Sequence, residues 1–166
     1  MTGPLAYLIT FRTYGTWLHG EERGSVDRNN RARGEVLIAP NKARLVSEEA
    51  RLKSLPFTLN AEQRAIVDKT IRTVCDYKKW SISELNVRTN HIHVVVTPDC
   101  APELAMNTLK SWSTRRLVEE GTVEKGFKPW ARHGSTKYLW KPESVVAACH
   151  YVREGQGGEL PLHDFE

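Results

Sequence analysis

The sequence predicts a single α+β domain in which short strands alternate with amphipathic helices. The chain has 166 residues, enough for one domain with its own core and too few for two comfortable ones. Helix-like segments carry apolar residues at intervals of three and four, whereas shorter segments are rich in β-branched and aromatic residues. Two of these strand-like segments are separated only by Thr89 and Asn90, which predicts an antiparallel hairpin.

The N-terminal third combines one strand with a long irregular segment. Residues Leu5 to Thr13 are rich in β-formers and predict a mostly buried strand. A basic, glycine-containing insertion follows at about 14–56, in which Ser47 to Leu55 favours a short helix. Connections of this length in a compact domain are usually functional or partly disordered. Its arginines could follow phosphates along a nucleic acid, or they could form an ordinary solvated surface.

The middle of the chain predicts a helix followed by the hairpin. Asn60 and Gln63 form a capping box at the start of a helix over Ala61 to Tyr77. The next strand begins near Trp80 and changes parity around Glu84, which predicts a bulge. The second hairpin strand begins at His91 and ends at Thr97.

The C-terminal half predicts two more helices with a short strand between them. A helix starts at Pro102 and runs to about Glu120, and the final helix runs from Pro142 to about Gln156. Residues Tyr138 to Trp140 predict the last strand. Trp130 and Trp140 are interpreted as core residues in preference to base-stacking platforms.

The motif that suggests chemistry is Asn90-His91-Ile92-His93. Successive side chains of a strand alternate between faces, so His91 and His93 share one face and form half of a metal site. A His-x-His pair is about as often solvated as metal-bound, so it needs support from elsewhere. Tyr151 lies about 100° around the final helix from Val152, beside the apolar stripe, where its hydroxyl could reach a neighbouring site.

The basic residues suggest an anionic partner. The net charge is only +4, but basic side chains cluster between Lys110 and Lys141. Such side chains neutralise phosphates, and hydroxyl groups donate to them, although a solvated helix face has the same composition. The candidate DNA-binding residues are Lys110, Ser113, Arg115 and Arg116 in one helix, with Arg12 and Arg132 outside it.

The cysteine pattern and the apolar segments indicate the cellular compartment of the protein. The three cysteines show no CxxC spacing, which favours a reduced protein. No secretory leader follows Met1 and no apolar run approaches membrane-spanning length. We expect a cytoplasmic protein with no membrane partner.

In order and spacing, these segments resemble the HUH single-tyrosine transposases, especially the REP-associated tyrosine transposases and IS200-like relatives. The resemblance spans most of the chain and rests on three parts: Asn90-His91-Ile92-His93, Leu109-Lys110-Ser111 with Arg115-Arg116, and Tyr151. It implies one HUH endonuclease-type domain over 1–166, built on a ferredoxin-like antiparallel sheet with helices packed on one face.

The resemblance also implies a reaction. His91 and His93 would hold Mg²⁺ or Mn²⁺, and Tyr151 would cut single-stranded DNA through a covalent 5′-phosphotyrosine. The chemistry of an imidazole pair taken alone would favour zinc or another transition metal. The DNA sequence, the presence of a hairpin and the choice between monomer and homodimer stay open.

One departure from the family pattern concerns the third metal ligand. Relatives commonly place Gln or Asn four positions after the tyrosine, where this chain has Gly155. Gln156 is our first choice for the ligand and Glu154 the second.

Two other functions are kept as alternatives. One is a non-catalytic nucleic-acid-binding protein derived from such a transposase. The other is a metal-dependent hydrolase of small molecules, which would need further ligands, and His19, His133 and His150 show no convincing ligand spacing.

Overall fold

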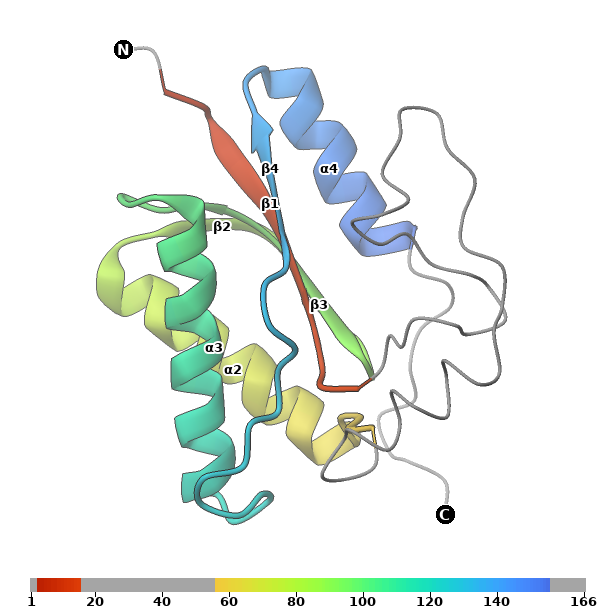
Figure 1. Cartoon of the computed structure of the whole chain (residues 1–166). Helices are drawn as coiled ribbons and strands as arrows, with labels where there is room; N and C mark the ends of the chain where they lie inside the picture. Colours follow the sequence, from red (N-terminus) through yellow and green to blue (C-terminus); the bar gives the residue numbers. More distant parts are fainter. Residues whose placement is uncertain (1–2, 16–55, 156–166) are drawn as a thin grey trace, which may run out of the picture.

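The structure, a computed structural model, describes residues 3–15 and 56–155, which form an antiparallel sheet flanked by helices (Figure 1). Most of the predicted insertion, with its expected helix over 47–55, lies outside the described residues, as does the tail from Gln156. The elements are, in chain order, β1 (Ala6–Arg12), α2 (Ala61–Lys78), β2 (Ser81–Val87), β3 (His91–Thr97), α3 (Pro102–Glu119), β4 (Ser135–Leu139) and α4 (Pro142–Glu154).

The strand order is β2-β3-β1-β4, and every neighbouring pair is antiparallel. Together with the chain order β1-α2-β2-β3-α3-β4, this is the predicted ferredoxin-like arrangement, which is therefore confirmed. Helices α2 and α3 pack together on one face of the sheet, as expected. Helix α4 is added after this unit and covers part of the opposite face, so the expectation that the helices pack on one face is met by α2 and α3 and is wrong for α4 (Figure 1).

The larger core lies between the sheet and helices α2 and α3. Alternate residues of β3, including Ile92 and Val94, point into it and are fully buried. Ile71 of α2 and Leu109 of α3 meet them from the helices. Full burial of one such side chain contributes about 1.5–3 kcal/mol, so this face holds the central strand rigidly in place.

A smaller core joins α4 to the other face of the sheet. Val95 of β3 and Ala6 of β1 contact Ala148 and Val152, which are the buried residues of α4. The amphipathic stripe predicted for the last helix is thus the surface that attaches it to the sheet. The histidine pair, which has the same strand parity as Val95, lies on this α4 face.

Several local expectations are confirmed. The Asn60 and Gln63 capping box is present, and α2 ends one residue beyond the predicted position. The register between β2 and β3 shifts between Ile82 and Glu84, where the bulge was expected. Trp130 is partly buried and packs edge-to-face on Phe11, with ring centroids 5.1 Å apart.

Two expectations around the last strand are wrong. Strand β4 begins at Ser135, three residues before the predicted start, and ends at Leu139. Trp140 therefore follows the strand, and it is 56% exposed where a core position was expected. The physical reason is that β4 lies at the edge of the sheet and pairs only with β1. Its bounds are set by that pairing, so its own residues need not alternate between buried and exposed positions.

The described residues include all three cysteines and the helices α2, α3 and α4. The cysteines are all unpaired, and burial raises the pKa of the Cys75 thiol to about 11. Among the helices that the structure describes, none combines the length and the apolarity needed to cross a membrane.

Candidate functional site

The site is built around the two histidines of β3. His93 is buried at 6% exposure and His91 is partly exposed, with their ring centroids 4.7 Å apart. Both rings point to the α4 face because Ile92 between them points into the larger core. The prediction that this motif places two imidazoles side by side is confirmed.

Each imidazole is oriented by a polar neighbour at its Nδ1 atom. Thr10 Oγ1 lies 2.7 Å from His93 Nδ1, across the β1–β3 pair in which these two residues are directly opposite. Asn90 Oδ1 lies 2.7 Å from His91 Nδ1. A carboxamide oxygen can only accept, so His91 donates through Nδ1 and its lone pair is at Nε2. Metal-binding histidines are usually fixed in this way by a second partner on the other ring nitrogen.

Tyr151 approaches the pair from α4. Its ring centroid lies 5.6 Å from that of His93, with the ring planes at 76°. The neighbouring Val152 is fully buried against the sheet, whereas Tyr151 is 48% exposed. The predicted boundary position beside the apolar stripe is thus confirmed, and the last helix of the same chain brings its phenol to the histidine face.

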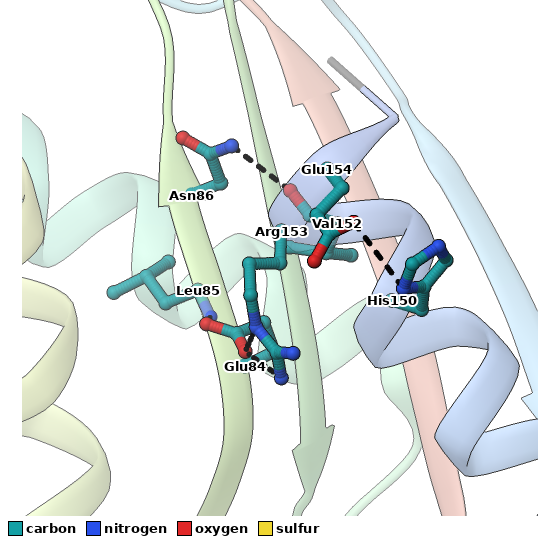
Figure 2. A network of polar contacts seen from close by, with 7 residues as sticks. All are labelled: Glu84, Leu85, Asn86, His150, Val152, Arg153 and Glu154. Atoms are coloured by element: carbon teal, nitrogen blue, oxygen red, sulfur yellow. Dashed lines mark hydrogen bonds and ion pairs between the residues drawn. The ribbon is translucent and has the colours of Figure 1, made fainter. Parts of the chain in front are cut away.

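Two polar contacts attach the end of α4 to β2 (Figure 2). Asn86 Nδ2 donates to the carbonyl oxygen of Val152 at 2.9 Å. Arg153 forms an ion pair with Glu84 at 2.9 Å. Carbonyls in the last turn of a helix lack intrahelical partners, so Asn86 satisfies one that would otherwise depend on water. These contacts involve the two residues that follow the tyrosine and thereby fix its place on the helix.

A cleft of about 750 Å³ opens beside the pair and is bounded by β1, β4 and α4. Its chemistry is mixed. The lining includes one imidazole, two phenols, two cations and two serine hydroxyl groups, from His93, Tyr138, Tyr151, Arg12, Lys137, Ser135 and Ser144. Apolar groups such as Leu8 and Ala147 complete the wall, so the cleft suits a ligand that carries both negative charge and flat apolar surface.

The third metal ligand is not placed by the described residues. Gln156 lies outside them. Glu154 is exposed, and its carboxylate lies 3.7 Å from His150 Nδ1, one turn back along α4. Within residues 3–15 and 56–155, no three His, Cys, Asp or Glu side chains are grouped to hold a metal ion. Glu154 therefore does not join the histidine pair in this arrangement, and His133 and His150 form no separate metal cluster.

The six predicted DNA-binding residues separate into two groups. Arg12 lines the cleft, and a smaller pocket of about 200 Å³ joins it to Arg132. The other four belong to α3, which packs on the opposite face of the sheet.

Within α3, the structure contradicts the prediction for Ser113 and gives Lys110 a structural contact. Ser113 is fully buried, and its hydroxyl has no hydrogen-bond partner in the part of the chain that is described. A DNA contact at Ser113 is therefore wrong for this arrangement. Lys110 Nζ donates to the carbonyl oxygens of Ala131 and His133 at 3.1 and 2.7 Å, and burial lowers the pKa of its ammonium group. Its contacts thus hold the segment that carries Arg132.

The exposed arginines of α3 keep accessible charge but lie away from the histidine face. The guanidinium of Arg115 lies over the Trp112 ring at 5.1 Å, and Arg116 pairs with Glu119 at 3.4 Å. They could extend a nucleic-acid surface without touching the groups around Tyr151.

Sequence reasoning missed three residues of the site: Thr10, Asn86 and Lys137. Strand parity could have placed Lys137 on the same face of the sheet as Arg12 only if β4 had been predicted correctly. Thr10 and Asn86 are both aligned with His93 across neighbouring strands, and that register becomes visible only in the sheet.

Comparisons with known proteins extend this picture. The sequence model of a family described as "Transposase IS200 like" matches residues 51–153. No curated protein sequence matches the chain. Similar solved structures include a REP-associated tyrosine transposase bound to a REP hairpin, with 10% identity and a TM-score of 0.46 over 92% of this chain. The chain covers 66% of that structure's length.

A second similar structure is a protein from Deinococcus radiodurans R1 assigned as a transposase. It shows 12% identity and a TM-score of 0.45, with 95% of each chain covered. The match over 51–153 includes the histidine strand, α3 and most of α4 through Tyr151. The chain belongs to the IS200-like transposase family.

Proposed function

We propose that this transposase is a metal-dependent single-stranded DNA endonuclease and strand transferase that works through a covalent 5′-phosphotyrosine. The observation that carries the proposal is the position of Tyr151, whose ring lies 5.6 Å from that of His93. Because one chain supplies both groups, a strand held at this face would meet the nucleophile and the imidazole pair together.

In this reaction the phenol oxygen of Tyr151 attacks the scissile phosphorus. The phenolic proton is lost, the bond from phosphorus to the 3′ oxygen breaks, and that oxygen takes up a proton to become a free 3′-hydroxyl. The 5′ end stays attached to the tyrosine as a phosphodiester. The energy of the broken linkage is retained, so attack by another 3′-hydroxyl reverses the step and joins a different strand.

The histidine pair fits a divalent metal ion as two of its ligands. Asn90 sets the His91 tautomer with its lone pair at Nε2, and the Thr10 contact leaves the same atom of His93 as the ligand in this proposal. Gln156 is our candidate for a further ligand, with Mg²⁺ or Mn²⁺ as the ion. When bound, such an ion supplies Lewis-acid stabilisation of the charge that develops on the phosphate.

The proposed partner is single-stranded DNA, with hairpin-containing strands included. Arg12 and Lys137 in the cleft, together with Arg132 beside it, would neutralise backbone phosphates near Tyr151. We expect the protein to act in the cytoplasm. A homodimer remains compatible with this scheme, since each chain carries its own histidine pair and tyrosine.

Covalent capture tests the proposal. The protein is incubated with single-stranded oligonucleotides from both flanks of its own gene, with Mg²⁺ or Mn²⁺, and analysed on denaturing gels. We expect a metal-dependent shifted band that Tyr151→Phe and His91→Ala both lose. Tight binding of the same oligonucleotides with no shifted band in any metal would contradict the proposal.

That contrary result would favour a non-catalytic DNA-binding protein. The observation behind this second candidate is that, among the described residues, no third His, Cys, Asp or Glu side chain is grouped with the histidine pair to hold a metal ion.

A further inference from the structure

Gly155 ends α4 in a backbone conformation that does not itself require glycine. Its φ of −81° and ψ of 4° are accessible to any L residue. Its N–H donates to the carbonyl oxygen of Tyr151 at 2.8 Å and closes the last turn. The reason for a glycine here must therefore lie in the space around it.

That space is filled by the tyrosine. A Cβ atom built on Gly155 would lie 2.8 Å from Cδ2 and 3.3 Å from Cε2 of the Tyr151 ring. It would also lie 2.7 Å from the Tyr151 carbonyl oxygen. Distances below 3.0 Å are essentially never seen for real Cβ atoms, so any other residue at position 155 would require the ring, the last turn or both to shift.

The surroundings leave the ring little freedom to adjust without moving its hydroxyl. The ring also lies next to His93, with the centroids 5.6 Å apart. The backbone of the last turn is held to β2 by Asn86 and by the Glu84–Arg153 pair (Figure 2). A methyl group at position 155 would therefore be accommodated mainly by a change in the χ1 angle of Tyr151, which moves the ring together with its hydroxyl.

We propose that Gly155 is a positioning residue for Tyr151: the absence of a side chain lets the phenol ring lie across the end of α4 and against His93. This inference rests on the proposed function for its catalytic meaning. The role of Gly155 in this inference is spatial: the Tyr151 ring fills the space that a side chain at position 155 would need.

Gly155→Ala is the first test. Position 155 is exposed and its φ and ψ are accessible to alanine, so the variant should still fold. We expect the rate constant of adduct formation at saturating DNA to fall about 10- to 100-fold, because small displacements of a reacting group cost rates of this order. The Kd for DNA should stay unchanged. Gly3→Ala adds the same methyl where no atom lies within 4 Å and should react like the wild type.

Gly155→Gln separates a spatial role from a missing ligand. This variant adds an amide oxygen that could bind a metal, but its Cβ meets the same ring atoms. We expect it to lose at least as much rate as Gly155→Ala. Faster adduct formation in Gly155→Gln than in Gly155→Ala would overturn the inference.

A spectroscopic measurement tests the ring position without any DNA. The aromatic signals of Tyr151 in a ¹H–¹³C spectrum are assigned by their absence in Tyr151→Phe. We expect Gly155→Ala to shift these signals and leave those of Tyr7 unmoved. If the wild type forms no adduct, the proposed function fails and this spectrum alone decides the inference. Unchanged Tyr151 signals, or a wild-type rate in Gly155→Ala, would contradict it.

Discussion

The smallest features that shape the site are the Nδ1 contacts of its imidazoles. Thr10 reaches His93 at 2.7 Å from the neighbouring strand, and Asn90 reaches His91 from the adjacent residue. Such partners fix both the tautomer and the ring orientation of a ligand, and their loss typically costs 10- to 100-fold in metal affinity. The hydroxyl of Thr10 is therefore expected to matter although, in the proposed scheme, it touches neither DNA nor metal.

Replacing Thr10 with valine tests this contact. Valine keeps the branched shape and removes only the hydroxyl, so we expect the Mn²⁺ concentration for half-maximal adduct formation to rise about 10-fold or more. The rate at saturating Mn²⁺ should recover. The control is Thr97→Val, which removes a hydroxyl that donates to the Leu5 carbonyl at the other end of the sheet. Equal Mn²⁺ requirements in both variants would rule out the orienting role.

Lys110 shows how a basic residue in a plausible surface pattern can have a structural role. Its ammonium group lies on the carbonyls of Ala131 and His133, so Lys110→Met leaves two acceptors without their donor. We expect the free energy of unfolding to fall by about 1–3 kcal/mol in urea titrations. The exposed Lys125, replaced by methionine, is the matched control and should change stability by less than about 0.5 kcal/mol. Similar stability of the two variants would show that the Lys110 contacts contribute little.

The site residues that sequence alone could reveal are those defined by local periodicity. His91 and His93 share a face because strands alternate, and Tyr151 lies beside a stripe because helices have 3.6 residues per turn. Thr10 could not be found in this way, since it meets His93 across 83 positions of sequence and only through the β1–β3 register. Gly155 looked like a gap in a ligand pattern because the ring that fills its space cannot be seen in the sequence.

Among the elements, α4 carries the proposed nucleophile and is attached to the sheet by few groups. Its buried apolar residues are small, with Ala148 and Val152 as the main contacts. Polar contacts with β2 therefore have a large share in fixing its last turn, which contains Tyr151 (Figure 2).

Asn86→Leu removes the hydrogen bond between β2 and the Val152 carbonyl at similar side-chain volume. We expect the rate of adduct formation to fall about 10-fold while DNA affinity changes little, because the last turn of α4 loses a fixed position relative to His93. Single-turnover cleavage and equilibrium binding give the two quantities. Ser83→Leu, at an exposed position of the same strand, serves as the control. A loss of binding with an unchanged rate would place Asn86 in DNA recognition instead.

The elements that sequence predicted well have strong local signals. The capping box set the start of α2, and the short turn before His91 set the hairpin. Strand β4 was missed in part because Ser135 to Lys137 has no apolar alternation, and its pairing partner lies far away in β1. Edge strands of this kind are defined by their neighbour more than by their own residues.

At the scale of the whole molecule, the sheet separates two environments. Helices α2 and α3 cover one face and α4 lies on the other (Figure 1). The histidine pair and the cleft are on the α4 side. An apolar stripe predicts that a helix packs on the sheet, but it does not say on which face. The ferredoxin-like order could thus be expected from the sequence, whereas the side taken by α4 could not.

This separation predicts different effects for two pairs of arginines. Arg12→Gln with Arg132→Gln should lower DNA cleavage at limiting DNA and reduce the salt slope of binding by about 0.7 for each phosphate that is no longer neutralised. Arg115→Gln with Arg116→Gln, on α3, should leave the cleavage rate at saturating DNA unchanged. DNA affinities measured between about 50 and 200 mM salt would give the salt slope of each double variant. A larger loss of cleavage from the α3 pair would contradict the assignment of the cleft face as the reacting face.

The most direct test of the central claim is to identify the residue that becomes attached to DNA. The covalent product is digested with protease and nuclease, and the modified peptide is sequenced by tandem mass spectrometry. We predict a 5′-linked nucleotide on Tyr151 and an unmodified peptide when metal is removed. A nucleotide on any other residue, or cut DNA with no attached peptide, would show that Tyr151 is not the nucleophile.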